Sequence, residues 1–240
     1  MNIKFYDKIE IDKKEVLRYL EYKNQKIDSN LNSIIDDCIK LTKSKINPRY
    51  TLGVYSILKE KINYNYQIKF RDSELVIESK DLYKLLNNCN ECIVLAATIG
   101  INIEKEIKIN SYLNLTKSII IDACATTAIE DFCGKLQSNI ELILNKEGKY
   151  ITNRYSPGYG DLNIDFNEIF INLLSTSRKI GLTITEDKIM VPRKSVVAII
   201  GISEIESRYN KKTCLECLNY NTCKYKKGDN SHGCKRVHKK

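Results

Sequence analysis

One segment near the middle of the chain constrains the fold more than any other. Between Ser118 and about Leu144, apolar or small residues recur at helical spacing over about seven turns. The stripe consists of Ile121, Ala125, Ala128, Phe132, Leu136, Ile140 and Ile143. Gly148 follows, where a helix commonly ends. A helix of this length must bury its stripe against another layer, and its many small residues let a neighbour or a ligand approach closely.

The rest of the chain mixes helical and extended patterns. Residues 10–45 predict two helices, the second ending before Asn47-Pro48. Residues 50–78 are rich in strand-favouring types and contain a turn at 71–73. Further elements are expected as a short helix near 81–86, a helix near 167–176, and strands at 93–97, 150–153, 188–191 and 195–203. Because these elements do not alternate regularly, the sequence predicts an α+β protein.

Hydropathy and charge restrict the possible environments. The longest apolar runs, Ile93–Ile101 and Val196–Ile202, are far shorter than the roughly 20 residues that span a membrane. The first 14 residues do not resemble a secretory signal, so we expect a cytoplasmic protein. Of the net charge of +9, the segment 211–240 contributes +7, from nine lysines and arginines against two acids. The nearly neutral body argues against a nucleic-acid-binding surface there.

Nine cysteines are many for a reducing compartment, where clustered cysteines indicate metal or redox chemistry. Cys38, Cys124 and Cys133 fall on helical patterns and are expected to be core residues. Cys89 and Cys92 form one isolated CxxC pair, which we also interpret as structural. The remaining four lie in the basic C-terminal segment.

The segment Arg154-Tyr155-Ser156-Pro157-Gly158-Tyr159-Gly160 is a candidate ligand loop. Pro157-Gly158 suits the centre of a type II turn, and the two glycines expose bare backbone to a ligand. Arg154 offers a planar, permanently charged group that can pair with a carboxylate. Tyr155 and Tyr159 supply aromatic faces.

Arg154-x-x-x-Gly158-Tyr159, with Pro157 before the glycine, resembles the S-adenosylmethionine-binding motif of the activation domain of cobalamin-dependent methionine synthase. Three further blocks keep that family's order, so that the resemblance spans roughly residues 90–205. They are Leu95–Gly100 followed by Glu104, the segment from Asp122-Ala123 to Glu130, and Met190-x-Pro192-x-x-Ser195-Val196.

The resemblance implies a mainly antiparallel twisted sheet flanked by helices, and a domain that presents the methyl group of S-adenosylmethionine to cobalamin. Arg154 would bind the ligand carboxylate, Ser156 and Gly158 would offer main-chain contacts, and Tyr159 would flank the corrin. Glu130 is a candidate partner for the ligand's ammonium or sulfonium; a solvated helix face explains its position nearly as well. The family's aromatic pair in the late strand is replaced here by Ile200-Gly201.

The C-terminal segment lies outside this resemblance. Four cysteines within it, Cys214, Cys217, Cys223 and Cys234, suit one tetrahedral zinc site or an iron–sulfur cluster. His232 or His238 could replace one ligand. We therefore expect two parts: residues 1–210 as an activation-type domain and residues 211–240 as a basic metal-binding tail. The tail could also attract an acidic flavodoxin or ferredoxin as electron donor.

Three functions remain in competition. The first is an accessory protein that binds S-adenosylmethionine and reactivates cobalamin on a methionine synthase in trans, a part of a methyltransferase activity whose acceptor is on another chain. The second is an iron–sulfur redox activator of another corrinoid methyltransferase. The third, a zinc knuckle that binds RNA, is the weakest, because few aromatic residues interleave the basic ones.

Overall fold

The computed structural model describes residues 8–22, 25–71 and 73–205. The predicted tail and its boundary at residue 210 lie outside these ranges. In the described part, no helix is long and apolar enough to cross a membrane.

The core of the fold is a six-stranded antiparallel sheet in the order β3-β2-β1-β4-β8-β5. Its strands are β1 (Arg49–Ile62), β2 (Asn65–Phe70), β3 (Val76–Glu78), β4 (Cys89–Thr98), β5 (Tyr150–Ile151) and β8 (Ser195–Ser203). A separate small ribbon pairs β6 (Thr183–Ile184) with β7 (Met190–Val191). The predicted α+β class with a mainly antiparallel sheet is therefore confirmed.

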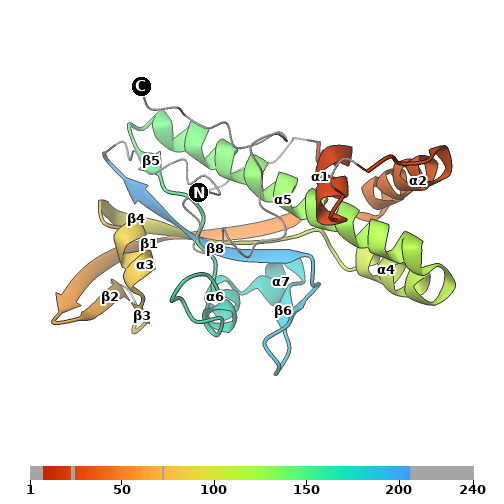
Figure 1. Cartoon of the computed structure of the whole chain (residues 1–240). Coiled ribbons are helices and arrows are strands. Elements are labelled where there is room, and N and C mark those ends of the chain that lie inside the picture. The colour runs from red at the N-terminus through yellow and green to blue at the C-terminus, as the bar shows by residue number, and fades with distance from the viewer. Residues whose placement is uncertain (1–7, 23–24, 72, 206–240) are drawn as a thin grey trace.

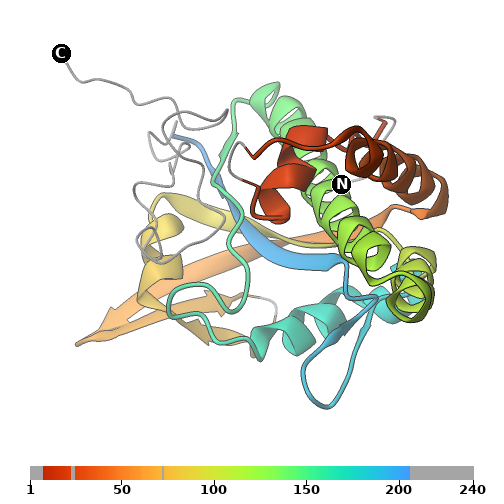
Figure 2. The same ribbon diagram turned by 45° about the vertical axis from the view of Figure 1, so that its right-hand side comes forward.

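Helices cover both faces of the sheet (Figure 1). On one face lie α1 (Lys13–Tyr19), α2 (Ser29–Lys45), α4 (Asn102–Leu113) and the long α5 (Leu115–Asn145), and on the other lie α3 (Lys80–Leu85), α6 (Phe166–Leu174) and α7 (Thr176–Ile180). The turned view in Figure 2 shows the same division into three layers.

The central strand β4 is apolar from Cys92 to Ala97 because both of its faces are buried there. Val94 and Ala96 pack in the cluster that contains α6, whereas Ile93 and Leu95 pack in a cluster with the C-terminal half of α5. All four side chains are fully buried. This two-sided burial explains why the segment reads as a continuous apolar run, without the alternation of a half-exposed strand.

Helix α5 matches the predicted helix closely. It begins three residues earlier than expected, because Asn114 caps it by accepting a hydrogen bond from the backbone N–H of Lys117 at 3.0 Å. Its predicted stripe packs on the sheet and against α1, α2 and α4. Local periodicity did not predict α4, which packs along the first half of α5.

Candidate functional site

The loop predicted as a ligand loop follows β5 and begins beside the middle of β8. Tyr155 and Ile199 exchange two backbone hydrogen bonds of 2.9 Å, which fix the start of the loop to the sheet. The backbone N–H of Tyr159 donates to the carbonyl of Ser156 at 3.2 Å, and Gly158 has a φ of +88°. The predicted turn with Pro157-Gly158 at its centre is present, with the positive φ that favours glycine.

The far end of the loop is held by the N-terminus of α3. The carboxylate of Asp161 accepts hydrogen bonds from the hydroxyl of Ser79 and from the backbone N–H of Lys80 at 2.7 Å. Burial alone would raise the pKa of Asp161, but these hydrogen bonds and that from the N–H of Asp81 outweigh it and lower the pKa. The loop is therefore tied to the protein at both ends.

Gly160 makes a close approach within this loop. Its φ is +52°, and a Cβ at this position would clash with the Tyr155 hydroxyl and lie 2.6 Å from a carboxylate oxygen of Asp81. The same tyrosine hydroxyl donates to the carbonyl of Tyr159 at 3.1 Å. Glycine is required here by both backbone conformation and space.

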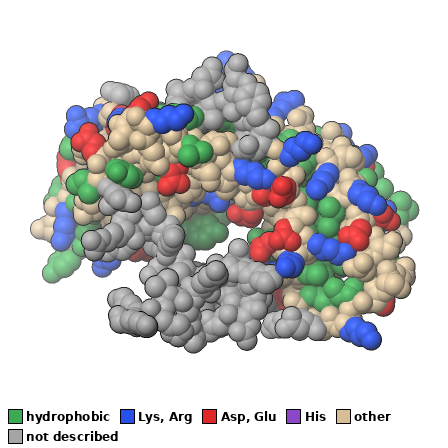
Figure 3. Space-filling view, turned by 90° about the horizontal axis from the view of Figure 1, so that it is seen from above, with side chains coloured by type: hydrophobic (Ala, Val, Ile, Leu, Met, Phe, Trp, Pro, Cys, Tyr) green, Lys and Arg blue, Asp and Glu red, His purple; other side chains and the backbone are tan. Residues whose placement is uncertain are grey.

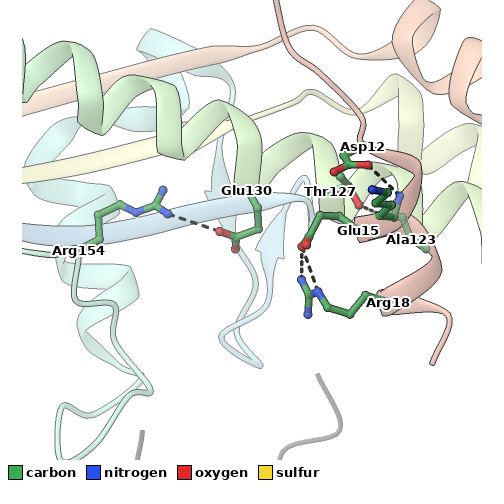
Figure 4. A network of polar contacts seen from close by, with 8 residues as sticks. Asp12, Glu15, Arg18, Ala123, Thr127, Glu130 and Arg154 are labelled. Carbon is green, nitrogen blue, oxygen red and sulfur yellow. Dashed lines mark hydrogen bonds and ion pairs between the residues drawn. The ribbon is translucent and has the colours of Figure 1, made fainter. Parts of the chain in front are cut away.

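Arg154 extends from the start of the loop to α5, where its guanidinium faces the carboxylate of Glu130 (Figure 4). Nη2 and Oε2 are 3.5 Å apart, at the limit of a hydrogen bond. The Arg154 side chain is 21% exposed, and its Nη1 is buried with no hydrogen-bond partner among the described residues. A charged group in this position retains unused capacity to bind an anion.

A buried thiol completes the surroundings of Arg154. Cys133 lies one turn beyond Glu130 on α5 and is fully buried. Burial raises its pKa to about 12, although the positive charge of the nearby Arg154 guanidinium lowers it in part. The thiol is therefore neutral, and it supplies no charge to balance the arginine.

An acidic groove of about 520 Å³ lies next to Glu130, between α5 and the region of α1. It is lined by Glu10, Asp12, Glu15, Tyr19, Thr127, Glu130 and Asp131. Figure 3 looks onto this side of the molecule and shows acidic side chains close together near its centre. The groove suits a ligand with a cationic or hydrogen-bond-donating body.

The acids of this groove are neutralised to different degrees. Glu15 forms an ion pair of 2.6 Å with Arg18, and Asp131 forms one of 2.9 Å with Lys135. The contact of Glu130 with Arg154 is longer at 3.5 Å, and the Glu130 side chain is 52% exposed. Glu130 is thus the acid of these three pairs most available to an incoming cation.

The structure brings two of the predicted site residues, Arg154 and Glu130, into contact. Ser156 and Gly158 form the turn beyond Arg154, and Tyr159 is 66% exposed at its tip. Within the described ranges, no hydrogen bond or ion pair joins the Tyr159 side chain to Arg154 or Glu130. The roles of Ser156, Gly158 and Tyr159 in binding a ligand remain predictions.

Sequence reasoning missed the part of the groove that the N-terminal region supplies. Glu10, Asp12 and Glu15 approach α5 only in the folded chain, where the backbone N–H of Glu10 donates to Asp131 at 2.8 Å. A usable signal was the spacing of Thr127, Glu130 and Asp131, which share one side of α5 near the small-residue segment.

The described residues include five of the nine cysteines. Cys38, Cys89, Cys92, Cys124 and Cys133 are free and buried, as expected for core residues. No group of side chains suited to a metal ion occurs in the portion of the chain that the structure describes. The predicted ligands Cys214, Cys217, Cys223 and Cys234 lie outside that portion.

Comparisons with known proteins agree with this architecture. A crystal structure described as the MetH reactivation domain bound to AdoHcy matches with a TM-score of 0.53 and 17% identity, over 80% of this chain and 70% of that one. A search of curated protein sequences found no match. The family model described as the activation domain of vitamin B12 dependent methionine synthase matches residues 94–216, just over half of the chain. This chain therefore belongs to the family of vitamin B12 dependent methionine synthase activation domains.

Proposed function

We propose that this chain binds S-adenosylmethionine between Arg154 and Glu130 and presents its methyl group to cobalamin carried by a separate corrinoid protein. Membership of the activation-domain family supports this proposal, as does the S-adenosylhomocysteine in the related crystal structure. The cobalamin supplies the methyl acceptor, so the task of this chain is to bind and orient the methyl donor.

The observation that carries the proposal is the state of the Arg154 guanidinium. Its Nη1 is buried without a partner among the described residues, and its Nη2 makes only a 3.5 Å contact with Glu130. A ligand carboxylate would satisfy Nη1 and replace this long contact by short, charge-assisted hydrogen bonds. The amino-acid end of S-adenosylmethionine carries such a carboxylate.

Glu130 complements this exchange. When a ligand carboxylate takes over Arg154, the Glu130 carboxylate becomes free to face the ligand's ammonium or sulfonium. The other acids of the groove, such as Asp12, add to the negative potential around a cationic ligand. The groove should therefore favour S-adenosylmethionine over S-adenosylhomocysteine, which lacks the sulfonium charge.

The loop would complete the site from the other side. Gly158 presents backbone without a Cβ, and one end of the loop is fixed to Ile199 and the other to the start of α3. A loop held in this way keeps its backbone groups in place before a ligand arrives, which lowers the entropy lost on binding. The exposed ring of Tyr159 would then contact the corrin of the partner.

Isothermal titration calorimetry of the whole chain with S-adenosylmethionine tests the proposal. Arg154→Ala should weaken binding by about 3 kcal/mol, or roughly a hundredfold. Arg178→Ala, which removes an exposed arginine on α7, is the matched control and should bind as the wild type does. Glu130→Gln should weaken S-adenosylmethionine binding more than S-adenosylhomocysteine binding. Equal titrations for Arg154→Ala and the wild type would remove Arg154 from the site.

We also infer that Cys214, Cys217, Cys223 and Cys234 bind one metal ion or cluster, and the support is their spacing in the sequence. Metal analysis of the whole chain and of Cys214→Ser/Cys217→Ser should show a stoichiometric metal that the variant loses. Visible absorption that bleaches on reduction would indicate an iron–sulfur cluster, and a colourless zinc protein would exclude it. A cluster combined with no S-adenosylmethionine binding would favour the redox-activator function, with a flavodoxin or ferredoxin as electron source.

A further inference from the structure

A second cavity, of about 720 Å³, lies along α4 and shares no lining residue with the acidic groove. It is lined by Ile101, Glu104, Lys105, Ile107, Lys108, Ser111, Asp122, Arg193 and Lys194. These residues come from α4, from α5 and from the connection between β7 and β8. Four of them are cationic and two are acidic.

Glu104 links two walls of this cavity. Its carboxylate accepts hydrogen bonds from the backbone N–H groups of Arg193 and Lys194, the second at 3.2 Å. These bonds attach the β7–β8 connection to α4. The negative charge of Glu104 is thus directed at the backbone of the cavity wall, which leaves it less available to a ligand.

Asp122 also links two walls of the cavity. It forms an ion pair of 2.9 Å with Lys194, whose ammonium group also donates to the hydroxyl of Thr126 at 2.8 Å. The Lys194 side chain is 18% exposed, whereas the Asp122 side chain is 52% exposed. The connection between β7 and β8 is therefore fixed to α5 as well as to α4, and the cavity has rigid walls.

Three cations remain at this cavity without a neutralising partner. Within the described residues, the side chains of Lys105, Lys108 and Arg193 form no ion pair or hydrogen bond. Lys105 and Lys108 are three residues apart on α4 and line the same space as Arg193. Like charges that converge on one cavity repel one another, and a bound anion relieves this repulsion.

We propose that this cavity binds a small multivalent anion, such as a diphosphate or a compact polycarboxylate. Lysine and arginine together suit this chemistry, because ammonium groups act as mobile point charges while a guanidinium can bind two oxygens at once. The volume lies in the range of small-molecule sites. Ile101 and Ile107 provide an apolar wall for the uncharged part of such a ligand.

This site is separate from the methyl-donor groove but lies along the same helix. Asp122 and Glu130 are two turns apart on α5, or about 12 Å along its axis. Two ligands could therefore be bound at once, one cationic and one anionic. Binding of the anion does not depend on the proposed binding of S-adenosylmethionine.

Titration of the whole chain with pyrophosphate and with citrate at low salt tests the inference and distinguishes the two ligand chemistries. We expect saturable binding of at least one anion, with backbone amide NMR shifts at Glu104, Arg193 and Lys194. Lys105→Glu/Lys108→Glu should raise Kd about tenfold or more, because it replaces two attractive charges by two repulsive ones. The same variant should leave the S-adenosylmethionine titration unchanged.

Lys40→Glu/Lys43→Glu is the matched control, since it reverses two exposed lysines with the same spacing on α2. It should bind the anion as the wild type does. Equal weakening in both double variants would reveal attraction by overall charge only and would overturn the inference. So would the absence of saturable binding, or NMR shifts confined to the basic segment 211–240.

Discussion

Replacement of Gly160 by alanine should destabilise the protein far more than replacement of other glycines with a positive φ. Gly160 has a φ of +52°, and an added Cβ would meet the Tyr155 hydroxyl and a carboxylate oxygen of Asp81. Gly148 is the matched control, because its φ is +72° but a Cβ there would meet nothing within 4 Å. Comparison of the two alanine variants separates the energetic cost of backbone strain from the cost of a steric clash.

The magnitudes follow from these surroundings. An alanine in the left-handed region costs about 1 to 2 kcal/mol, part of which is recovered because alanine restricts the unfolded chain. Gly148→Ala should therefore lower the free energy of unfolding by about 1 kcal/mol. Gly160→Ala adds about 1 kcal/mol for the lost hydrogen bond from Tyr155 to Tyr159 and about 1 to 3 kcal/mol for displaced side chains. The expected total is about 3 to 5 kcal/mol.

Urea denaturation followed by circular dichroism measures both free energies, and the slopes should remain equal if only the folded state changes. The Gly160 variant should also bind S-adenosylmethionine less tightly, because Tyr155 and Asp81 must move and carry the loop with them. Equal destabilisation by the two substitutions would show that Tyr155 and Asp81 do not close around Gly160, and the description of an anchored loop would be wrong.

Three further outcomes follow from local environments. Gly134→Ala should raise the free energy of unfolding by about 0.5 to 1 kcal/mol, measured by urea denaturation, because Gly134 lies within α5 and a Cβ there meets nothing within 4 Å. Asp161→Ala should cost about 1 kcal/mol at neutral pH by removing the acceptor at the start of α3. Because the folded pKa of Asp161 is lowered, its contribution is present above the unfolded pKa and is lost as pH falls through the folded pKa; denaturation at several pH values should show this loss in the wild type and not in the variant. Cys89, Cys124 and Cys133, whose burial raises their pKa to about 11, 12 and 12, should resist alkylation in the native protein, and peptide mapping that finds them labelled would contradict their burial.

The parts of the fold that sequence patterns predicted are those that local periodicity determines. The stripe of α5, the strand at 93–97 and the turn at Pro157-Gly158 each depend on residues close together in the chain. Helix α4 was missed because its buried residues are few, with Ile103 and Asn110 buried, and no side chain caps its start at Ile101. Its stability comes from packing on α5, which no local pattern reveals.

The candidate site also combines residues that local sequence patterns predict with residues that only folding brings together. Arg154 and the loop were predicted from residue types and a family motif, and Glu130 from the resemblance of its segment to the same family. The N-terminal wall of the groove and the capping of α3 by Asp161 join segments about 80 to 120 residues apart, as the separations of their hydrogen bonds show. Such pairs depend on how the layers assemble, so a single sequence does not specify them.

The environment of Arg154 also indicates whether this arginine serves stability or binding. A structural arginine lowers the free energy of the fold through its partners, so its removal destabilises the protein. Arg154 has a buried Nη1 without a partner in the described part of the chain, which costs about 1 to 3 kcal/mol, and one long contact with a half-exposed carboxylate, which is worth about 0 to 1 kcal/mol. Arg154→Met retains much of the apolar packing and should therefore leave the ligand-free protein equally stable or up to about 2 kcal/mol more stable, while S-adenosylmethionine no longer raises its melting temperature. A loss of more than 1 kcal/mol in urea denaturation of the ligand-free variant would show that this guanidinium holds the fold together, and the argument that it is kept for a ligand would fail.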